Sequence, residues 1–150
     1  MEDAYTAILP FTVFLIKKRL CMNKYEIEPV GYIISDYKKR ALTHEESVNT
    51  PRGNAVIKIN SEFKKGLLGL KKGDKISVIF YFHMSRDYKL TVLKNPSDSP
   101  LGIFAVRSPD RPNGIGISKV EILEVKDDTL KINNSDMIDG TPIIDIKPGW

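Results

Sequence analysis

The sequence of 150 residues holds a single cysteine, Cys21, and only two histidines, His44 and His83. One cysteine excludes the disulfide framework that stabilises many small secreted domains. The cysteine and histidines are also too few and too widely spaced for a zinc site, which needs several such ligands at short spacing. The sequence therefore predicts a cytoplasmic protein with no metal.

Long hydrophobic runs are also scarce. The longest, AILPFTVFLI at residues 7–16, is interrupted by Pro10 and followed by three basic residues. It is too short to cross a bilayer, and its positive charges follow the apolar run instead of preceding it, unlike a secretory signal. We expect no membrane partner. Residues 1–21 are interpreted as an N-terminal extension, disordered, loosely docked or a mis-assigned start, before a domain at 22–150; a buried terminal strand is the alternative.

The overall composition fits one soluble globular domain. Hydrophobic residues make up 41% and charged residues 28% of the chain, close to the averages for folded domains, and 150 residues can bury a core. The net charge of +4 is compatible with a polyanionic partner such as nucleic acid, but does not identify one.

Short strand-like segments dominate the rest of the chain. They are rich in β-branched residues and bounded by Gly, Pro, Asn or Asp. Several alternate: Ile57 and Ile59 are expected on one face, and Leu90 with Val92 form a similar pair. The expected strands are 30–34, 55–60, 75–83, 88–94, 102–106, 118–125, 129–133 and 142–146.

Beyond these strands, the sequence indicates little other secondary structure. Residues 77–82 are apolar at nearly every position, which predicts a strand covered on both faces, central in its sheet or in a subunit contact. Residues 61–70 suggest one or two helical turns with Ser61 as the N-cap, and Lys126, Asp127 and Asp128 a hairpin turn. With no crossover helices, we expect a mainly β fold, a small antiparallel β-barrel or sandwich with one or two short helices.

Several catalytic signatures are missing. Gly114 and Gly116 begin like a dinucleotide fingerprint, but a third glycine and a following helix are absent. There is no phosphate-binding lysine loop, no zinc-protease helix and no nucleophile elbow. Covalent hydrolysis by a triad is therefore disfavoured.

One segment concentrates conformationally special residues: GIFAVRSPDRPNGIGIS, at 102–118. Pro109 and Pro112 stiffen it, Arg107 and Arg111 offer positive forks, and its glycines allow close backbone approach. The segment suits either a ligand-binding loop or a proline-braced turn whose arginines pair with acids elsewhere.

Together with DMIDGTPIIDIKP at 136–148, this segment resembles the paired signature of the TrmO (TsaA, or YaeB-like) family of S-adenosylmethionine-dependent tRNA methyltransferases. Fainter similarity covers IEPVGYIIS at 27–35 and residues 53–83. The resemblance implies a small antiparallel β-barrel, usually a homodimer. It also implies methylation of N6 of threonylcarbamoyladenosine beside the tRNA anticodon, in the cytoplasm.

The resemblance implies a site for the cofactor S-adenosyl-L-methionine. Its residues would be His83, Met84, Arg107, Ser108, Pro109, Arg111, Asn113, Ile117, Ile138, Asp139, Gly140 and Thr141. Asp139 alone would instead read as an Asp-Gly turn before a strand. The N6 proton would leave to water or to a nearby base, for which His83, Asp139 and Asp145 are the candidates; the alternative for His83 is a plain histidine at a strand end.

Two departures from the family pattern stand out. The family loop usually reads RPNPIG, and Gly114 replaces its second proline, which predicts a looser loop. The family segment PRQPG is reduced to TPRGNA around Pro51 and Arg52, so these two are doubtful ligands.

RNA contacts are expected from clustered basic residues, which neutralise phosphates; solvated surface is the alternative for each cluster. Tyr37 and Tyr88 are candidates for base stacking. The basic candidates are Lys38, Lys39, Arg40, Lys64, Lys65, Lys71, Lys72 and Lys75.

Two other functions stay open. A non-catalytic barrel that senses S-adenosylmethionine or binds RNA would retain the loop without turnover. Methylation of a different RNA or of a small molecule is the other.

Overall fold

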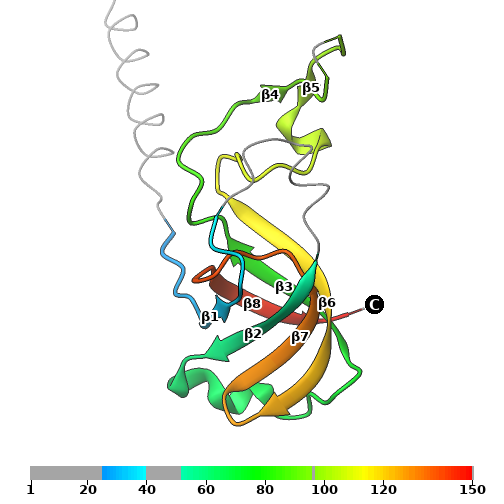
Figure 1. Cartoon of the computed structure of the whole chain (residues 1–150). Helices are drawn as coiled ribbons and strands as arrows, with labels where there is room; N and C mark the ends of the chain where they lie inside the picture. Colours follow the sequence, from blue (N-terminus) through cyan, green and yellow to red (C-terminus); the bar gives the residue numbers. More distant parts are fainter. Residues whose placement is uncertain (1–24, 40–51, 96, 150) are drawn as a thin grey trace, which may run out of the picture.

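Six antiparallel strands close into a barrel in the computed structural model, which describes residues 25–39, 52–95 and 97–149 (Figure 1). Around the barrel the order is β1-β2-β7-β6-β3-β8, and β8 pairs with β1 to complete the closure. The prediction of a small antiparallel β-barrel is confirmed. The strands are β1 (Gly31–Ile34), β2 (Gly53–Ile59), β3 (Lys75–Tyr81), β6 (Ile115–Lys126), β7 (Thr129–Ser135) and β8 (Pro142–Pro148).

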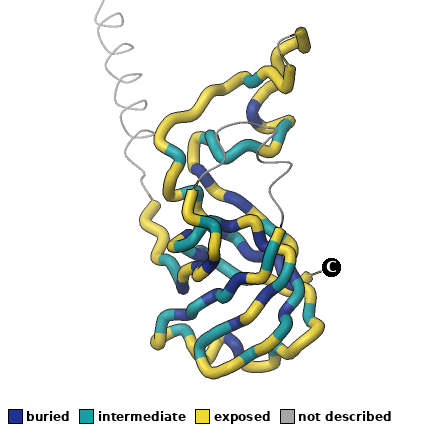
Figure 2. The backbone as a smooth tube through the Cα atoms, viewed as in Figure 1, coloured by how far each residue is buried: buried dark blue, intermediate teal, exposed yellow. Residues whose placement is uncertain are grey.

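Alternation along each strand produces the core. In β2, Ile57 and Ile59 are buried while Lys58 faces outward and pairs with Asp128 at 2.6 Å. Figure 2 shows buried residues recurring along the barrel strands. Burying large aliphatic side chains in this way is the main favourable term for folding. The fully buried aliphatic residues of the barrel are Ile33, Ile57, Ile76, Val78, Ile122, Leu130, Ile132 and Ile143.

Two further sequence predictions concern β3 and the hairpin. Ser77 and Val78 are both buried, so coverage on both faces is confirmed at the start of the predicted segment 77–82, but Tyr81 near its end is exposed and the prediction is wrong there; a closed barrel also has no central strand. Asp127 and Asp128 form the turn between β6 and β7 as expected. Asp127 adopts a φ of 52°, a conformation that aspartate tolerates in turns.

The helix predicted at 61–70 is a 3-10 helix, η1 (Ser61–Leu67). Leu67 is buried, and Phe63 and Leu70 are half-buried against the core. Ser61 is not the N-cap: Asn60 occupies that position, and its side chain donates to the Pro29 carbonyl instead of capping. Gly66 within the segment lowers its α-helical propensity.

Residues 82–114, between β3 and β6, leave the barrel as an extended arm (Figure 1). The arm carries β4 (Thr91–Val92), β5 (Leu101–Gly102) and the 3-10 helix η2 (Ile103–Ala105). Of the strand predicted at 88–94 only Thr91–Val92 pairs, and the strand predicted at 102–106 is wrong beyond Gly102, because η2 follows. Leu90 is exposed because no barrel strand lies beside it, and β propensity without burial stabilises little.

The topology gives the barrel two distinct ends. We call the arm end the one where β1, β3 and β7 finish and β2, β6 and β8 begin. The opposite, or helix, end carries η1 and the hairpin turn at residues 127–128. Seven residues of β3 separate the ends, about 20 Å of strand. The predicted N-terminal extension, residues 1–21, lies outside the described residues.

Gly116 is required by packing inside the barrel. A Cβ at this position would lie 2.5 Å from the Phe80 ring and 2.8 Å from that of Phe82. We expect Gly116→Ala to lower the free energy of unfolding by about 1–3 kcal/mol through overpacking. Gly102→Ala is the matched control, since nothing lies within 4 Å of its Cβ position. Urea unfolding of both variants measures the difference, and equal stabilities would contradict this packing.

Candidate functional site

The two bends singled out in the sequence lie at the same end of the barrel. We call residues 107–114 the arginine loop and residues 136–141 the acidic turn. The backbone N–H of Phe82 donates to the Gly114 carbonyl at 2.7 Å, and the next residue, His83, has Nδ1 3.5 Å from Oγ1 of Thr141. The end of β3 therefore touches the arginine loop with one residue and the acidic turn with the next.

The two arginines of the loop have different roles. Nη1 of Arg111 donates to the carbonyls of Ile103 at 3.1 Å and Val106 at 2.8 Å, and its guanidinium lies 5.9 Å from the centre of the Phe104 ring. Arg111 thus fastens η2 to the loop. Arg107 is exposed, and no hydrogen bond or ion pair holds it within the described part of the chain. Arg107 is the arginine that a ligand can recruit.

Gly114 closes the arginine loop. Its φ is 59°, its N–H donates to the Arg111 carbonyl at 3.1 Å, and its carbonyl accepts from Phe82. Glycine adopts this conformation without strain, whereas proline would lack the N–H and would require a negative φ. The contacts fix the loop at this residue and give no support to the prediction that Gly114 loosens it.

Asp139 and Gly140 form the turn that leads into β8, which matches the simpler of the two sequence interpretations. Asp139 Oδ1 accepts from the Ser35 N–H at 2.9 Å, and Oδ2 pairs with Lys38 Nζ at 2.7 Å. Lys38 first, and then Ser35, hold the pKa of Asp139 below its ordinary value of 3.8. A carboxylate stabilised in this way is a poor proton acceptor near neutral pH.

The Asp139 ion pair predicts a pH dependence of stability. Because the pKa is lowered in the folded state, the stabilisation is complete above 3.8 and is lost as the pH falls through the lower, folded value. We expect the wild type to exceed Asp139→Asn in stability at pH 7, and the gap to shrink below pH 3.8. Urea titrations at several pH values measure it; a gap independent of pH would contradict this role.

The remaining candidate residues lie in two places, beside the acidic turn and on the outer face of the barrel. His83 and Met84 are exposed beside the acidic turn, where Ile138 is half-buried and Thr141 is buried. Asp145 lies on β8 and pairs with Lys147 at 2.7 Å. The structure thus brings His83, Asp139, Gly140 and Thr141 together. It places Ile117 on the outer face of β6, opposite Ile79.

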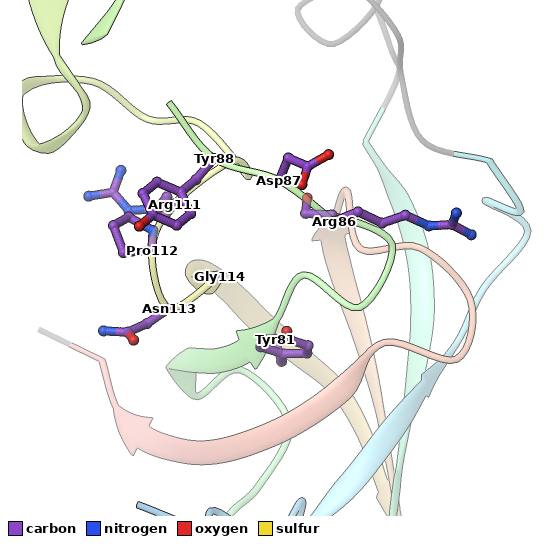
Figure 3. Close-up of a pocket in the computed structure, with 9 residues that line it drawn as sticks. Tyr81, Arg86, Asp87, Tyr88, Arg111, Pro112, Asn113 and Gly114 are labelled. Atoms are coloured by element: carbon purple, nitrogen blue, oxygen red, sulfur yellow. The ribbon is translucent and has the colours of Figure 1, made fainter. Parts of the chain in front are cut away.

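A cavity of about 180 Å³ lies between the end of β3, the start of the arm and the arginine loop (Figure 3). In this view Tyr88, Arg111, Pro112 and Asn113 lie on one side and Tyr81 on the other. Sequence reasoning missed Tyr81, the last residue of the apolar strand β3, and Ser85, Arg86 and Asp87, which follow it. The cavity is lined by Tyr81, Ser85, Arg86, Asp87, Tyr88, Arg111, Pro112, Asn113 and Gly114.

Most of the expected RNA contacts lie elsewhere. η1 and the loop after it carry Lys64, Lys65, Lys71 and Lys72 at the helix end, and β3 begins there with Lys75. Lys38 is paired with Asp139. At the arm end, Arg52 pairs with Asp136 at 3.5 Å, and Tyr37 lies half-buried against Gly53. Pro51, Arg40, His44 and Cys21 lie outside the described residues.

Two further features concern metals and membranes. Among residues 25–39, 52–95 and 97–149, no three His, Cys, Asp or Glu side chains gather where they could hold a metal ion. No helix in the same ranges is long and apolar enough to cross a membrane.

The closed barrel, its projecting arm and the two bends at its arm end define a class of single-barrel proteins. Comparison with known sequences and structures shows which family has these features. The family model for the tRNA-methyltransferase O N-terminal domain matches residues 32–150. The chain belongs to this TrmO N-terminal domain family. Among solved structures, TrmO from Pseudomonas aeruginosa superposes with a TM-score of 0.65 at 27% identity, over 85% of this chain and 57% of the other.

Proteins of similar sequence support the same family assignment. A probable S-adenosyl-L-methionine-binding protein of Halobacterium salinarum is 34% identical over 122 residues, covering 80% of this chain and 94% of the relative. A protein similarly named in Pyrococcus abyssi is 34% identical over 80% of this chain and 65% of its own. The tRNA (adenine(37)-N6)-methyltransferase of Escherichia coli is 31% identical over 85% of this chain, but this chain spans only 58% of it.

Proposed function

We propose that the protein is an S-adenosyl-L-methionine-dependent tRNA methyltransferase that methylates N6 of threonylcarbamoyladenosine next to the anticodon. One observation carries this proposal beyond the family: at the arm end the arginine loop contacts Phe82 and the acidic turn contacts the next residue, His83. Relatives named as methyltransferases of tRNA adenine 37 support the substrate class. A tRNA substrate would place the protein in the cytoplasm.

The residues at the arm end fit an adenosyl cofactor. Arg107 is an exposed cation with no partner in the described ranges, suited to the cofactor's carboxylate. Gly140, with a φ of 75° and open space at its Cβ position, lets a ligand approach the backbone. We propose that the cofactor is held by His83, Met84, Arg107, Ser108, Pro109, Ile138, Asp139, Gly140 and Thr141, with Arg111 bracing the loop; Ile117, on the outer face of β6, is not included.

The cofactor supplies an electrophilic methyl group, so the protein needs no covalent intermediate. The residues of the protein hold the acceptor nitrogen in line with this methyl group and remove one proton. We assign proton removal from N6 to His83, because Asp139 and Asp145 are each committed to a lysine. The Thr141 hydroxyl beside Nδ1 would orient the ring and leave Nε2 for the acceptor.

Two assays separate this proposal from a non-catalytic barrel. Calorimetry should show binding of S-adenosylmethionine, and labelled methyl should pass to tRNA that carries the threonylcarbamoyl group. Binding without transfer would favour a sensor, and absence of binding would contradict both. Transfer to another RNA or to a small molecule would revise the substrate only.

We further propose that the protein is a homodimer. The outer face where β3 meets β6 exposes Ile115 and Ile117, and Ile117 pairs in register with the half-buried Ile79. Neighbouring exposed apolar side chains of this kind often mark an interface. Analytical ultracentrifugation should give twice the chain mass; a monomer at micromolar concentration would contradict the assignment.

A further inference from the structure

The cavity beside the arginine loop has no role in cofactor binding as assigned above. We propose that it binds the base of the acceptor adenosine, turned out of the RNA stack. This inference rests on the proposed function and assigns Tyr81, Tyr88, Asn113 and Ser85 to the RNA substrate. For Asn113 it replaces the cofactor role that the family resemblance implies.

The size of the cavity suits one base. Pockets for whole drug-sized ligands usually measure roughly 300–1,000 Å³. At about 180 Å³ this cavity is too small for a complete adenosyl cofactor, but it can take a single flat ring system. Enzymes that modify a base within structured nucleic acid extrude that base into a close-fitting pocket.

Two tyrosines give the cavity its stacking surfaces. Tyr81 and Tyr88 both line it, and their side chains are 42% and 54% exposed. Gly114 leaves room for one of them, since a Cβ there would lie 3.1 Å from the Tyr81 ring. Stacking on aromatic side chains is a common way of holding unpaired RNA bases.

Two polar side chains can read the edge of the base. Asn113 lines the cavity, and an asparagine amide can donate to and accept from adenine simultaneously. Ser85 also lines the cavity, and its buried hydroxyl has no hydrogen-bond partner within the described part of the chain. A buried hydroxyl without a partner costs stability, so a ligand atom that satisfies it is favoured.

The cavity lies next to the turn of the chain that carries His83. The His83 N–H donates to the Tyr81 carbonyl at 2.9 Å, and the Ser85 N–H donates to the Phe82 carbonyl at 3.0 Å. This tight turn sends Tyr81 and Ser85 to the cavity while His83 meets Thr141 of the acidic turn. A base in the cavity would therefore lie beside the same turn of the chain, residues 81–85, that carries His83.

The test compares two anticodon stem-loop RNAs that are identical except that one carries adenine and the other an abasic ribose at the target position. With S-adenosylhomocysteine present, the wild type should bind the adenine RNA about tenfold more tightly, the typical contribution of base stacking. Tyr88→Ala and Asn113→Ala should reduce this ratio towards one while the affinity for S-adenosylhomocysteine is unchanged. Tyr25→Ala, another exposed tyrosine, is the matched control and should keep the full ratio.

Equal wild-type affinity for the two RNAs, or a full ratio in both variants, would overturn the assignment. A loss of S-adenosylhomocysteine affinity in Asn113→Ala would overturn it too, because Asn113 would then contact the cofactor and not the base. The readout needs no turnover. Adenine discrimination without methyl transfer would therefore uphold the base pocket and contradict the proposed function.

Discussion

Arg107→Ala is expected to lower the affinity for S-adenosylmethionine by about 10- to 150-fold, the equivalent of about 1.5–3 kcal/mol for a charged hydrogen bond. The melting temperature should not change, because Arg107 is exposed and makes no hydrogen bond or ion pair among the residues described. Isothermal calorimetry and thermal unfolding of the same preparation measure both quantities.

Arg111→Ala is the control for this variant. Removing its guanidinium takes the Arg111 hydrogen bonds from the Ile103 and Val106 carbonyls, leaves Ile103 only the weaker bond from the Val106 N–H at 3.4 Å, and removes the contact with Phe104. We expect a loss of stability of about 1–3 kcal/mol. Unchanged cofactor affinity in Arg107→Ala would remove the arginine loop from the cofactor site.

His83→Gln is expected to lower kcat by about 10²- to 10⁴-fold, the usual contribution of a positioned general base. Glutamine can still hydrogen-bond Thr141 but cannot accept the proton. The measurement is single-turnover methyl transfer at saturating cofactor and tRNA. A kcat near that of the wild type would show that the proton leaves without His83.

Much of the barrel could be predicted because local pattern and global packing agree. Ile57 and Ile59 alternate with polar residues, and the barrel buries them as expected. Leu90 and Val92 show the same alternation, yet they lie in the arm with Leu90 exposed. Periodicity identifies a segment suited to a strand, but it does not reveal whether another strand lies beside it.

The site was predicted in part. Two prolines and two arginines identify the arginine loop in the sequence. The sequence does not show which arginine is free for a ligand, because Arg111 donates to carbonyls five and eight residues away. The ion pair of Asp139 with Lys38 depends on contacts across about a hundred residues, which no local pattern encodes. The cavity around Tyr81 was missed for the same reason.

The position of the lysine cluster relative to the arm end could not be predicted from the sequence. Lys64, Lys65, Lys71 and Lys72 form a clear basic run in the sequence, but the fold places them at the helix end. About 20 Å of strand separates them from the arm end. An RNA whose target base reaches His83 would have to extend along the barrel to touch these lysines, so their role in binding stays a prediction.

The central claim is that the arginine loop and the acidic turn together hold the cofactor. It is tested most directly by assigning the backbone amide signals of the protein and adding S-adenosylhomocysteine. The account predicts shifts concentrated in residues 82–84, 107–114 and 138–141, with residues 61–75 and 127–128 unchanged. Shifts confined to the helix end, or to only one of the two bends, would contradict it.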